Sequence, residues 1–326
     1  LCGLGGGNFS SSMANISFFY PKAKKGTATG LNAGIGNLGV SLAQFVVPLV
    51  ISSAMVGSFT GEGLHYVEKG VEKTLWLQNA GFVWVPFIVI SAILAWFGMN
   101  DIADAKASFK DQAIIFRRKH NWLMCWLYVG TFGSFIGFSA GLALLTKSQF
   151  PDVNPTQYAF LGPLVGALTR PVGGWISDRL KAGATVTLYT FLLMVLGVVG
   201  VLFTLPSEGH AGNFPAFLGM FILLFALSGI GNGSTFRMIP VIFLTARTQE
   251  AEKTPEAQRQ AVVQGNKEAS AVLGFSGAVG AYGGFFIPKS FGTSLEATGS
   301  VDMALYAFIA FYLSCMVVTW WFYARK

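Results

Sequence analysis

One arginine, Arg170, lies deep inside an apolar segment of the sequence, LGPLVGALTRPVGGWIS. If this segment is a membrane-spanning helix, a rise of roughly 1.5 Å per residue places Arg170 about 10–20 Å from either end. A central arginine costs roughly 2.5–3.5 kcal/mol to insert into a bilayer. Its planar guanidinium could bind a planar oxyanion through two parallel hydrogen bonds, which makes Arg170 a candidate fixed cation for an anionic substrate. The alternative is that Arg170 snorkels or binds neighbouring carbonyl groups.

The other charges favour the same chemistry. All fifteen Asp and Glu residues fall outside the predicted spans, and the three histidines lie in loops or at span ends. An interior with positive charge and no titratable acid favours an anion path over a cation or proton path. A second arginine, Arg237, is predicted about eight residues from the cytoplasmic end of its span, where snorkelling is the favoured interpretation.

Aromatic and amide side chains recur at helical spacing in two other spans. Tyr128 and Phe132 are spaced i, i+4 and share one helix face, which by itself is more typical of packing than of binding. Asn37, Ser41 and Gln44 form a polar stripe along another helix. Polar stripes either line a site or hold membrane helices together, and the residues alone leave both interpretations open.

Small residues mark helix faces that could approach one another closely. Gly30 and Gly34 lie along the same side as the polar stripe. A second strip recurs every three residues and consists of Gly274, Gly277, Gly280 and Gly283, with Gly284 adjacent. Because such strips allow close backbone contact, we expect the second one at the contact between moving halves, with a static interface as the alternative.

A short connection follows the span of Arg170 and carries the sequence GWISDRLK at 174–181. The aspartate, Asp178, lies at a helix end beside basic residues. It could form a charge clamp to the terminus of a neighbouring helix. The alternative is a solvated turn.

The elements that must position these residues are predicted to be membrane-spanning helices. Only 11% of the 326 residues are charged, and the mean hydropathy is +0.56; ordinary soluble domains carry about 25% charged residues. Apolar stretches reach the length of about 20 residues that crosses a bilayer, and they do not alternate as transmembrane strands would. The nine stretches cover residues 1–20, 28–54, 79–99, 121–146, 157–177, 184–205, 214–245, 269–288 and 303–323. The expected fold class is an all-α polytopic membrane protein.

Basic residues in the loops predict the orientation of these helices. Sixteen Lys and Arg residues fall on one side of the predicted spans and four on the other. Cytoplasmic loops carry an excess of Lys and Arg, so we expect the first side, together with the C-terminus, in the cytoplasm.

Two blocks of the sequence resemble each other on either side of a basic loop at 100–120. GLGGG in the first block corresponds to GIGNG in the second, and Gly34 and Pro48 have the same spacing as Gly274 and Pro288. Repeated halves with a site between them are typical of secondary transporters. Three predicted spans precede the loop and six follow it, so we expect a 6+6 architecture whose first three spans precede Leu1.

Other functional classes are disfavoured by the same features. The net charge of +7 is spread over short loops, so no nucleic-acid partner is expected. No catalytic or nucleotide motif occurs, and Cys2, Cys125 and Cys315 lie alone in apolar runs. We therefore expect no enzyme activity, no cofactor and no metal. A membrane-embedded enzyme would need intramembrane acids, histidines or a metal cluster, and an anion channel fits the repeated halves less well than a rocking carrier does.

The sequence resembles the nitrate/nitrite porter family of the major facilitator superfamily in two glycine-rich signatures, GLNAGIGNLGVS at 30–41 and GFSGAVGAYGGFF at 274–286. The segment at 174–181 resembles the cytoplasmic motif of that superfamily. The resemblance implies helices 4–12 of a twelve-helix transporter, with residues 1–99 in the first bundle, 100–120 as the loop between bundles and 121–326 as the second bundle. It also implies a monomer in the lipid bilayer of the bacterial inner membrane.

The family further implies a site between the bundles, where one arginine from each bundle holds nitrate or nitrite. Arg170 matches the arginine of the second bundle, and its partner would belong to helix two. Tyr128 and Phe132 match the aromatic residues of helix seven, Phe9 that of helix four, and Asn37 the signature asparagine of helix five. Ser276 and the signature glycines would line the path or the interface, and Asp178 and Arg179 would act in the cytoplasmic motif. The signature glycines are Gly30, Gly34, Gly36, Gly39, Gly274, Gly277, Gly280, Gly283 and Gly284.

The residues agree with an acid-free site for a flat anion that only accepts hydrogen bonds. Positive edges of aromatic rings can face such an anion, and a narrow aromatic slot would disfavour tetrahedral phosphate or sulfate. Because buried unpaired arginines are costly, an empty carrier should resist reorientation. We therefore expect nitrate/nitrite exchange by alternating access, with nitrate/proton symport as the main alternative and an anion channel as a further one.

Overall fold

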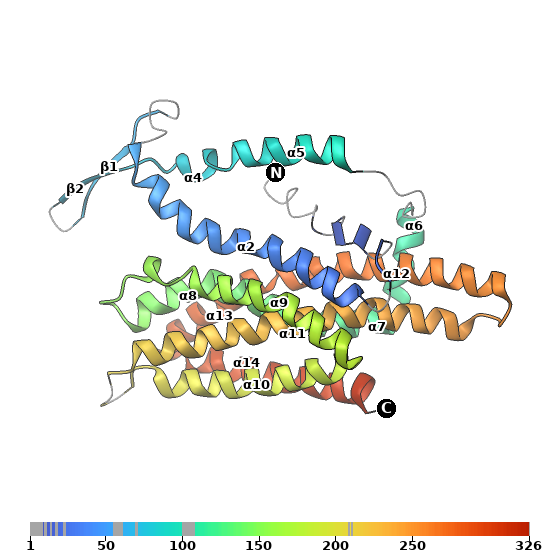
Figure 1. Ribbon diagram of the computed structural model, residues 1–326. Coiled ribbons are helices and arrows are strands. Elements are labelled where there is room, and N and C mark those ends of the chain that lie inside the picture. The colour runs from blue at the N-terminus through green and yellow to red at the C-terminus, as the bar shows by residue number, and fades with distance from the viewer. Residues whose placement is uncertain are drawn as a thin grey trace.

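The computed structural model describes residues 9, 12, 13, 15, 16, 19–21, 24–54, 61–68, 71–99, 108–207, 209 and 211–325. Long helices run side by side as a bundle, and α11 (Phe214–Glu250) and α12 (Pro255–Ala281) extend beyond their neighbours at one end (Figure 1). The described chain is helical apart from a small hairpin and short connections. The all-α prediction is therefore confirmed for this part of the chain.

Before residue 100, the described elements are α2 (Lys25–Ile51), β1 (Leu64–Glu68), β2 (Val71–Leu75), α4 (Asn79–Phe82) and α5 (Val85–Gly98). The two strands pair antiparallel, with Leu64 opposite Leu75; the sequence analysis predicts no strand between these spans. Asn79 at the start of α4 donates to the carbonyls of Val50 and Ser53 at 3.1 and 3.2 Å. This amide therefore ties α4 to the end of α2.

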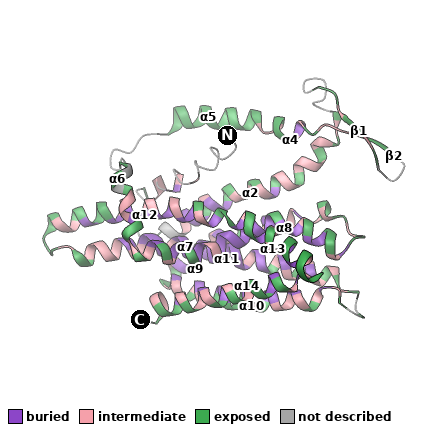
Figure 2. Cartoon of the chain, turned by 180° about the vertical axis from the view of Figure 1, so that it is seen from behind, coloured by how far each residue is buried: buried purple, intermediate pink, exposed green. Residues whose placement is uncertain are grey.

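The second half of the chain contains the longest helices. Its elements are α6 (Phe109–Gln112), η3 (Ala113–Arg117), α7 (Lys119–Tyr128), η4 (Val129–Gly133), α8 (Ser134–Gln149), η5 (Pro155–Gln157), α9 (Leu161–Leu180), α10 (Gly183–Thr204), α11 (Phe214–Glu250), α12 (Pro255–Ala281), α13 (Gly283–Thr298), α14 (Asp302–Thr319) and η6 (Trp320–Ala324). Burial concentrates in the middle of this bundle, whereas α5 has no buried residue (Figure 2).

Seven helical segments among the described residues are long and apolar enough to cross a membrane, and they match seven of the nine predicted spans. The predicted span 157–177 corresponds to α9, a helix of 20 residues that is not among the seven. Arg170 and Asp178 lower the hydropathy of α9. The predicted span 1–20 lies mostly outside the described residues.

The predicted span 269–288 forms only part of a longer helical segment. Residues 255–268 are polar, so hydropathy does not mark them, yet α12 begins at Pro255. Glu268 therefore lies inside helix α12, one residue before the predicted span, and is 2% exposed. Its oxygens accept hydrogen bonds from Arg118 Nε and Nη2 at 3.1 and 3.0 Å, and Arg247 Nε lies 3.7 Å away.

Helix α9 approaches two neighbouring helices so closely that side chains are excluded from the contacts. A Cβ atom at Gly34 of α2 would lie 2.8 Å from both the Ala167 oxygen and Pro171 Cδ. On the other side, a Cβ atom at Gly233 of α11 would overlap the carbonyl oxygen of Arg170. Small residues at membrane-helix contacts allow this close approach. The position of α9, and hence of Arg170, is fixed by glycine on both sides.

We expect Gly233→Val to destabilise the fold, because the added side chain would force α9 away from α11. Overpacking of this kind costs about 1–3 kcal/mol. Gly219→Val on the same helix is the matched control, since a Cβ atom at Gly219 would meet no atom within 4 Å. Unfolding of the purified chain in mixed detergent micelles measures the difference. Equal stability of the two variants would contradict the packing described for α9.

We also expect Glu268→Ala to lower the free energy of unfolding, because Arg118 and Arg247 would lose a buried carboxylate. Breaking a buried ion pair costs about 3–5 kcal/mol. We expect a loss of about 3 kcal/mol, because the Arg118 side chain is 28% exposed and solvent weakens its interaction. Glu250→Ala is the control: its side chain is 62% exposed and also pairs with Arg247, and exposed pairs contribute about 0–1 kcal/mol. The same micelle titration compares them, and a Glu268 effect no larger than that of Glu250 would refute this role.

Candidate anion-binding site

Arg170 is enclosed by the bundle, with 1% of the residue exposed. Its Nη2 donates a hydrogen bond to the Tyr128 hydroxyl at 2.9 Å. Nε and Nη1 are buried and have no hydrogen-bond partner among the described residues. The ion pairs found in the same part of the chain do not include Arg170. The side chain therefore neither snorkels nor binds carbonyl groups, and it keeps free donors inside the protein.

Four aromatic rings surround this guanidinium. Arg170 Cζ lies 5.8 Å from the ring centroid of Phe9, 5.5 Å from that of Phe132 and 4.8 Å from that of Phe236. The Tyr128 ring stacks on Phe132 and Phe236, with centroids 5.1 and 4.7 Å apart. Phe9 and Phe132 are parallel within 2° at 6.2 Å. The structure thus brings together Arg170, Tyr128, Phe132 and Phe9, as the sequence analysis expects.

Two residues of α11 complete this cluster and are absent from the sequence prediction. Phe236 is 0% exposed and supplies the ring nearest to the guanidinium. Asn232 is 1% exposed, lies beside the Tyr128 hydroxyl and has a buried Oδ1 without a partner among the described residues. The two are spaced i, i+4, like Tyr128 and Phe132, and Asn232 is the asparagine of the GIGNG repeat at 229–233. That combination is the signal that could have identified them.

The backbone around the cluster is irregular where the aromatic residues meet. Tyr128 ends α7, and Phe132 lies in the π-helical turn η4. Within this turn, Thr131 Oγ1 lies 3.3 Å from Thr235 Oγ1 of α11. Single π-turns inside α-helices are frequent at functional sites. This hydrogen bond links the turn to α11 beside the aromatic cluster.

Among the described contacts, no hydrogen bond joins Asn37 or Ser276 to the Arg170 guanidinium. Along α2, Gly34 opposes Ala167 and Ser41 Oγ donates to the Phe160 carbonyl at 2.8 Å. Asn37 lies between these two contacts along α2, so it lies opposite the part of α9 that precedes Ala167. Asn37 Nδ2 is buried and has no hydrogen-bond partner among the described residues. Ser276 is 0% exposed and donates to Leu273 of its own helix at 3.3 Å.

The glycine strip of α12 and α13 mainly contacts helices of the second half. A Cβ atom at Gly280 would lie 2.9 Å from Tyr128 Cδ1, one at Gly284 would lie 2.8 Å from Ile136 Cγ2, and one at Gly283 would overlap Gly133. With the expected boundary at residue 121, these three glycines pack within the second bundle, against α7, η4 and α8, which agrees with the static-interface alternative.

The remaining signature glycines differ in their surroundings. Gly277 faces the Phe9 ring, with a Cβ distance of 3.6 Å, and Gly274 is half-buried in α12. Gly30 approaches the Arg170 carbonyl oxygen, 3.1 Å from a Cβ atom. Gly36 and Gly39 are exposed, and a Cβ atom there would meet no atom within 4 Å among the described residues.

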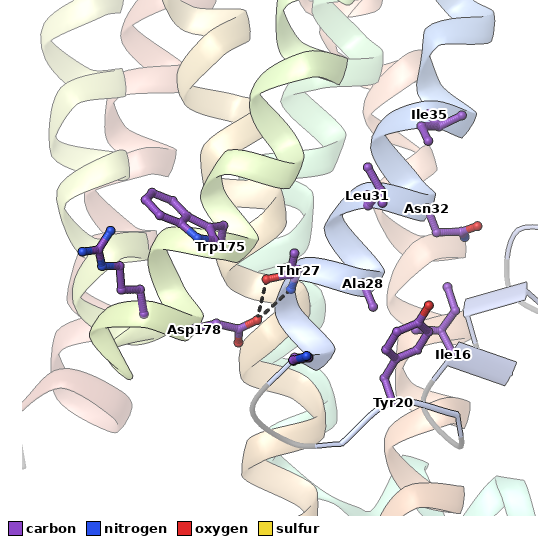
Figure 3. A pocket seen from close by; sticks show the side chains of 11 residues that line it. Ile16, Tyr20, Thr27, Ala28, Leu31, Asn32, Ile35, Trp175 and Asp178 are labelled. Atoms are coloured by element: carbon purple, nitrogen blue, oxygen red, sulfur yellow. Dashed lines mark hydrogen bonds between the residues drawn. The ribbon is translucent and has the colours of Figure 1, made fainter.

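Asp178 clamps the start of α2. Its Oδ2 accepts hydrogen bonds from the Thr27 backbone N–H at 2.7 Å and the Thr27 hydroxyl at 2.9 Å (Figure 3). Its Oδ1 accepts from Arg237 Nε at 3.0 Å. Arg237 is therefore paired with the carboxylate at the end of α9. Arg179 points its guanidinium toward the Trp175 ring, 5.3 Å from the centroid.

The polar chemistry of the cluster suits a small anion. Its free guanidinium N–H groups are donors, and no described carboxylate pairs with them. Within the described ranges, no group of three His, Cys, Asp or Glu residues is placed to hold a metal. Buried charge-assisted donors bind oxyanions strongly when water is excluded.

Comparison with known proteins gives the same family that the signatures indicate. The nitrate/nitrite transporters NarU of Salmonella typhimurium and Escherichia coli are each 49% identical over 326 residues, covering 100% of this chain and 70% of the relative. The probable nitrate/nitrite antiporter NarK2 of Thermus thermophilus is 41% identical over 334 residues, covering 100% of this chain and 69% of the relative. No family model matches the sequence.

A solved structure agrees at the level of the fold. The outward conformation of the major facilitator superfamily transporter FucP matches with a TM-score of 0.60 at 12% identity, covering 95% of this chain and 71% of that one. With the transporter relatives above, this fold makes the chain a multi-pass membrane protein of a transporter family. The chain belongs to the nitrate/nitrite porter family of the major facilitator superfamily.

Proposed function

We propose that this chain exchanges nitrate for nitrite across the bacterial inner membrane by alternating access. The observation that carries the proposal is the buried guanidinium of Arg170, which has two unpartnered nitrogens and no described carboxylate as counter-ion. The names of the relatives supply the chemical identity of the anions.

Nitrate and nitrite fit the donors that Arg170 presents. Both anions are flat and singly charged, and their oxygens only accept hydrogen bonds. A guanidinium edge with two N–H groups can meet two such oxygens at once. The Tyr128 hydroxyl accepts from Nη2, and Asn232 lies beside that hydroxyl. Both side chains would orient the anion further.

The aromatic walls would select for shape. Phe132 and Phe9 are nearly parallel, and Phe236 lies on the same guanidinium. Ring edges carry partial positive charge and can face an anion. A flat anion could lie along these rings, whereas tetrahedral phosphate or sulfate would need a wider space.

Exchange follows from the cost of an unpaired buried charge. When the site is empty, Arg170 has no counter-ion, and a buried cation without one is costly in a low-dielectric interior. Reorientation of the empty site is therefore expected to be slower than reorientation with a bound anion. The carrier would then return only when it carries an anion back.

The bundle assignments belong to the same proposal. Residues 1–99 and 121–326 form the two halves, 100–120 connects them, and the C-terminus lies in the cytoplasm of a monomer. In this arrangement, the bond between Asp178 and Thr27 joins α9 of one half to α2 of the other. It would close the cytoplasmic side and would break when that side opens.

Proton symport is the rival mechanism, and it needs a titratable group on the path. Glu268 is a buried carboxylate that the sequence analysis placed outside the spans. However, Arg118, Arg247 and Gln264 surround both of its oxygens. Glu268 is thus engaged in holding α12, which favours exchange over symport.

Uptake of labelled nitrate into proteoliposomes separates these mechanisms. We expect uptake when the vesicles contain nitrite, and at least tenfold less when they contain chloride or no permeant anion. The measurement uses equal protein in each vesicle set and is made first without a proton gradient and then with an acid exterior. Nitrate uptake into vesicles without a counter-anion, driven by an acid exterior, would overturn exchange and favour symport.

A further inference from the structure

The Arg170 cluster contains one hydrogen-bond acceptor that nitrate would leave unused. Asn232 is 1% exposed, and its Oδ1 is buried without a hydrogen-bond partner among the residues that the structure describes. Burying an acceptor to which nothing donates is costly, and the large majority of buried polar atoms in proteins have a partner. Nitrate and nitrite carry no hydrogen atom and cannot supply one. A ligand that satisfies this oxygen must bring a donor.

The acceptor is enclosed by the cluster itself. Tyr128, beside which Asn232 lies, and Phe236, one turn further along α11, are both 0% exposed. The glycines on either side of Asn232 bring α11 close to its neighbours: a Cβ atom at Gly231 would lie 2.7 Å from a side chain of η4, and one at Gly233 would overlap the backbone of α9. Asn232 therefore has a fixed place between the two elements that carry the aromatic rings and the guanidinium.

Asn232 lies within reach of an anion held by Arg170. Its side chain is beside the Tyr128 hydroxyl, which accepts a hydrogen bond from Arg170 Nη2 at 2.9 Å. Two hydrogen bonds that meet at one oxygen span at most about 6 Å. A small anion that makes one hydrogen bond to the guanidinium and one to the amide spans at least this distance. The same anion can therefore contact both groups.

We propose that the Arg170 site also binds bicarbonate, a flat monoanion that carries one O–H group. Two of its oxygens would accept from the guanidinium, as those of nitrate would, and its hydroxyl would donate to Asn232 Oδ1. Bicarbonate has the trigonal shape and the single charge of nitrate, so the same rings of Phe9, Phe132 and Phe236 would flank it. This inference rests on the proposed anion site at Arg170 and adds a second class of ligand to it.

Formate separates the shape of the anion from its hydrogen bonding. It is flat and singly charged and has two acceptor oxygens, but it has no O–H group. It should meet the guanidinium as nitrite does and leave Asn232 Oδ1 without a donor. A dependence on Asn232 that bicarbonate shows and formate lacks would therefore report the hydroxyl contact alone.

Competition titration of the purified full chain tests the proposal. Nitrate is titrated calorimetrically against rising bicarbonate, and bicarbonate is also titrated alone, in sealed cells at a mildly alkaline pH where the monoanion predominates. Binding is measured because carbon dioxide crosses bilayers without a carrier and would obscure a flux. We expect bicarbonate to displace nitrate from one shared site. Asn232→Leu should weaken bicarbonate binding about tenfold more than nitrate binding, since only bicarbonate loses a hydrogen bond to Oδ1.

Asn232→Ser is the second variant, for the case that the leucine is not accommodated in the core; its shorter side chain should give the same change in the affinity ratio. The control variant is Gln260→Leu, which removes an exposed amide of α12 and should leave both affinities unchanged. Formate should follow nitrate in every variant.

Two results would overturn the proposal: no displacement of nitrate by bicarbonate, or an equal loss of both affinities in the Asn232 variants, because Oδ1 would then not distinguish the two anions. A chain that binds and exchanges nitrate without binding bicarbonate refutes this inference alone. A chain that binds bicarbonate but does not exchange nitrate for nitrite refutes the proposed function instead.

Discussion

The buried guanidinium of Arg170 is the constraint on which the rest of the structure depends. A cation inside a membrane helix is costly, and here no described carboxylate offsets that cost. Partial compensation comes from the Tyr128 hydroxyl and from the faces of Phe132, Phe236 and Phe9. Cation–π contacts of this kind contribute about 0.5–2 kcal/mol each. A bound anion would offset the part of the burial cost that these contacts leave uncompensated. The affinity for the anion and the requirement that an anion be carried back therefore have the same physical origin.

Small residues give this cation its position. Gly30 and Gly34 on one side and Gly233 on the other bring α2 and α11 onto the backbone of α9. The Arg170 carbonyl lies at both contacts, so any change in this packing moves the guanidinium. Two other charged pairs fix α2 and α12: Asp178 lies near the end of α9, and Glu268 lies in the middle of α12. These two carboxylates are paired with arginines, whereas the Arg170 guanidinium has no described carboxylate beside it.

The helical fold and the central residues of the site could be predicted from the sequence, because depth within an apolar run and i, i+4 spacing are local properties. They mark Arg170, Tyr128 and Phe132 directly, whereas the place of Phe9 came from the family resemblance. Phe236 and Asn232 share the i, i+4 spacing, but one phenylalanine among 30 gives only a weak local signal, and the helix rotation that turns it inward is set by packing. The ion pairs of Arg237 and Glu268 could not be predicted for a related reason: hydropathy locates the apolar part of a helix, whereas their partners are 59 and 150 residues away in sequence.

Nitrate binding by Arg170→Lys tests the central claim most directly, because lysine keeps the charge but loses the two-pronged donor edge. Isothermal titration of the purified full chain with nitrate gives the affinity, and Arg259→Lys at an exposed position is the control. Loss of one charge-assisted hydrogen bond is worth about 1.5–3 kcal/mol, so the account predicts binding about 10- to 100-fold weaker for Arg170→Lys and unchanged for the control. Equal affinity of Arg170→Lys and the unchanged chain would contradict it, because the anion would then be held elsewhere.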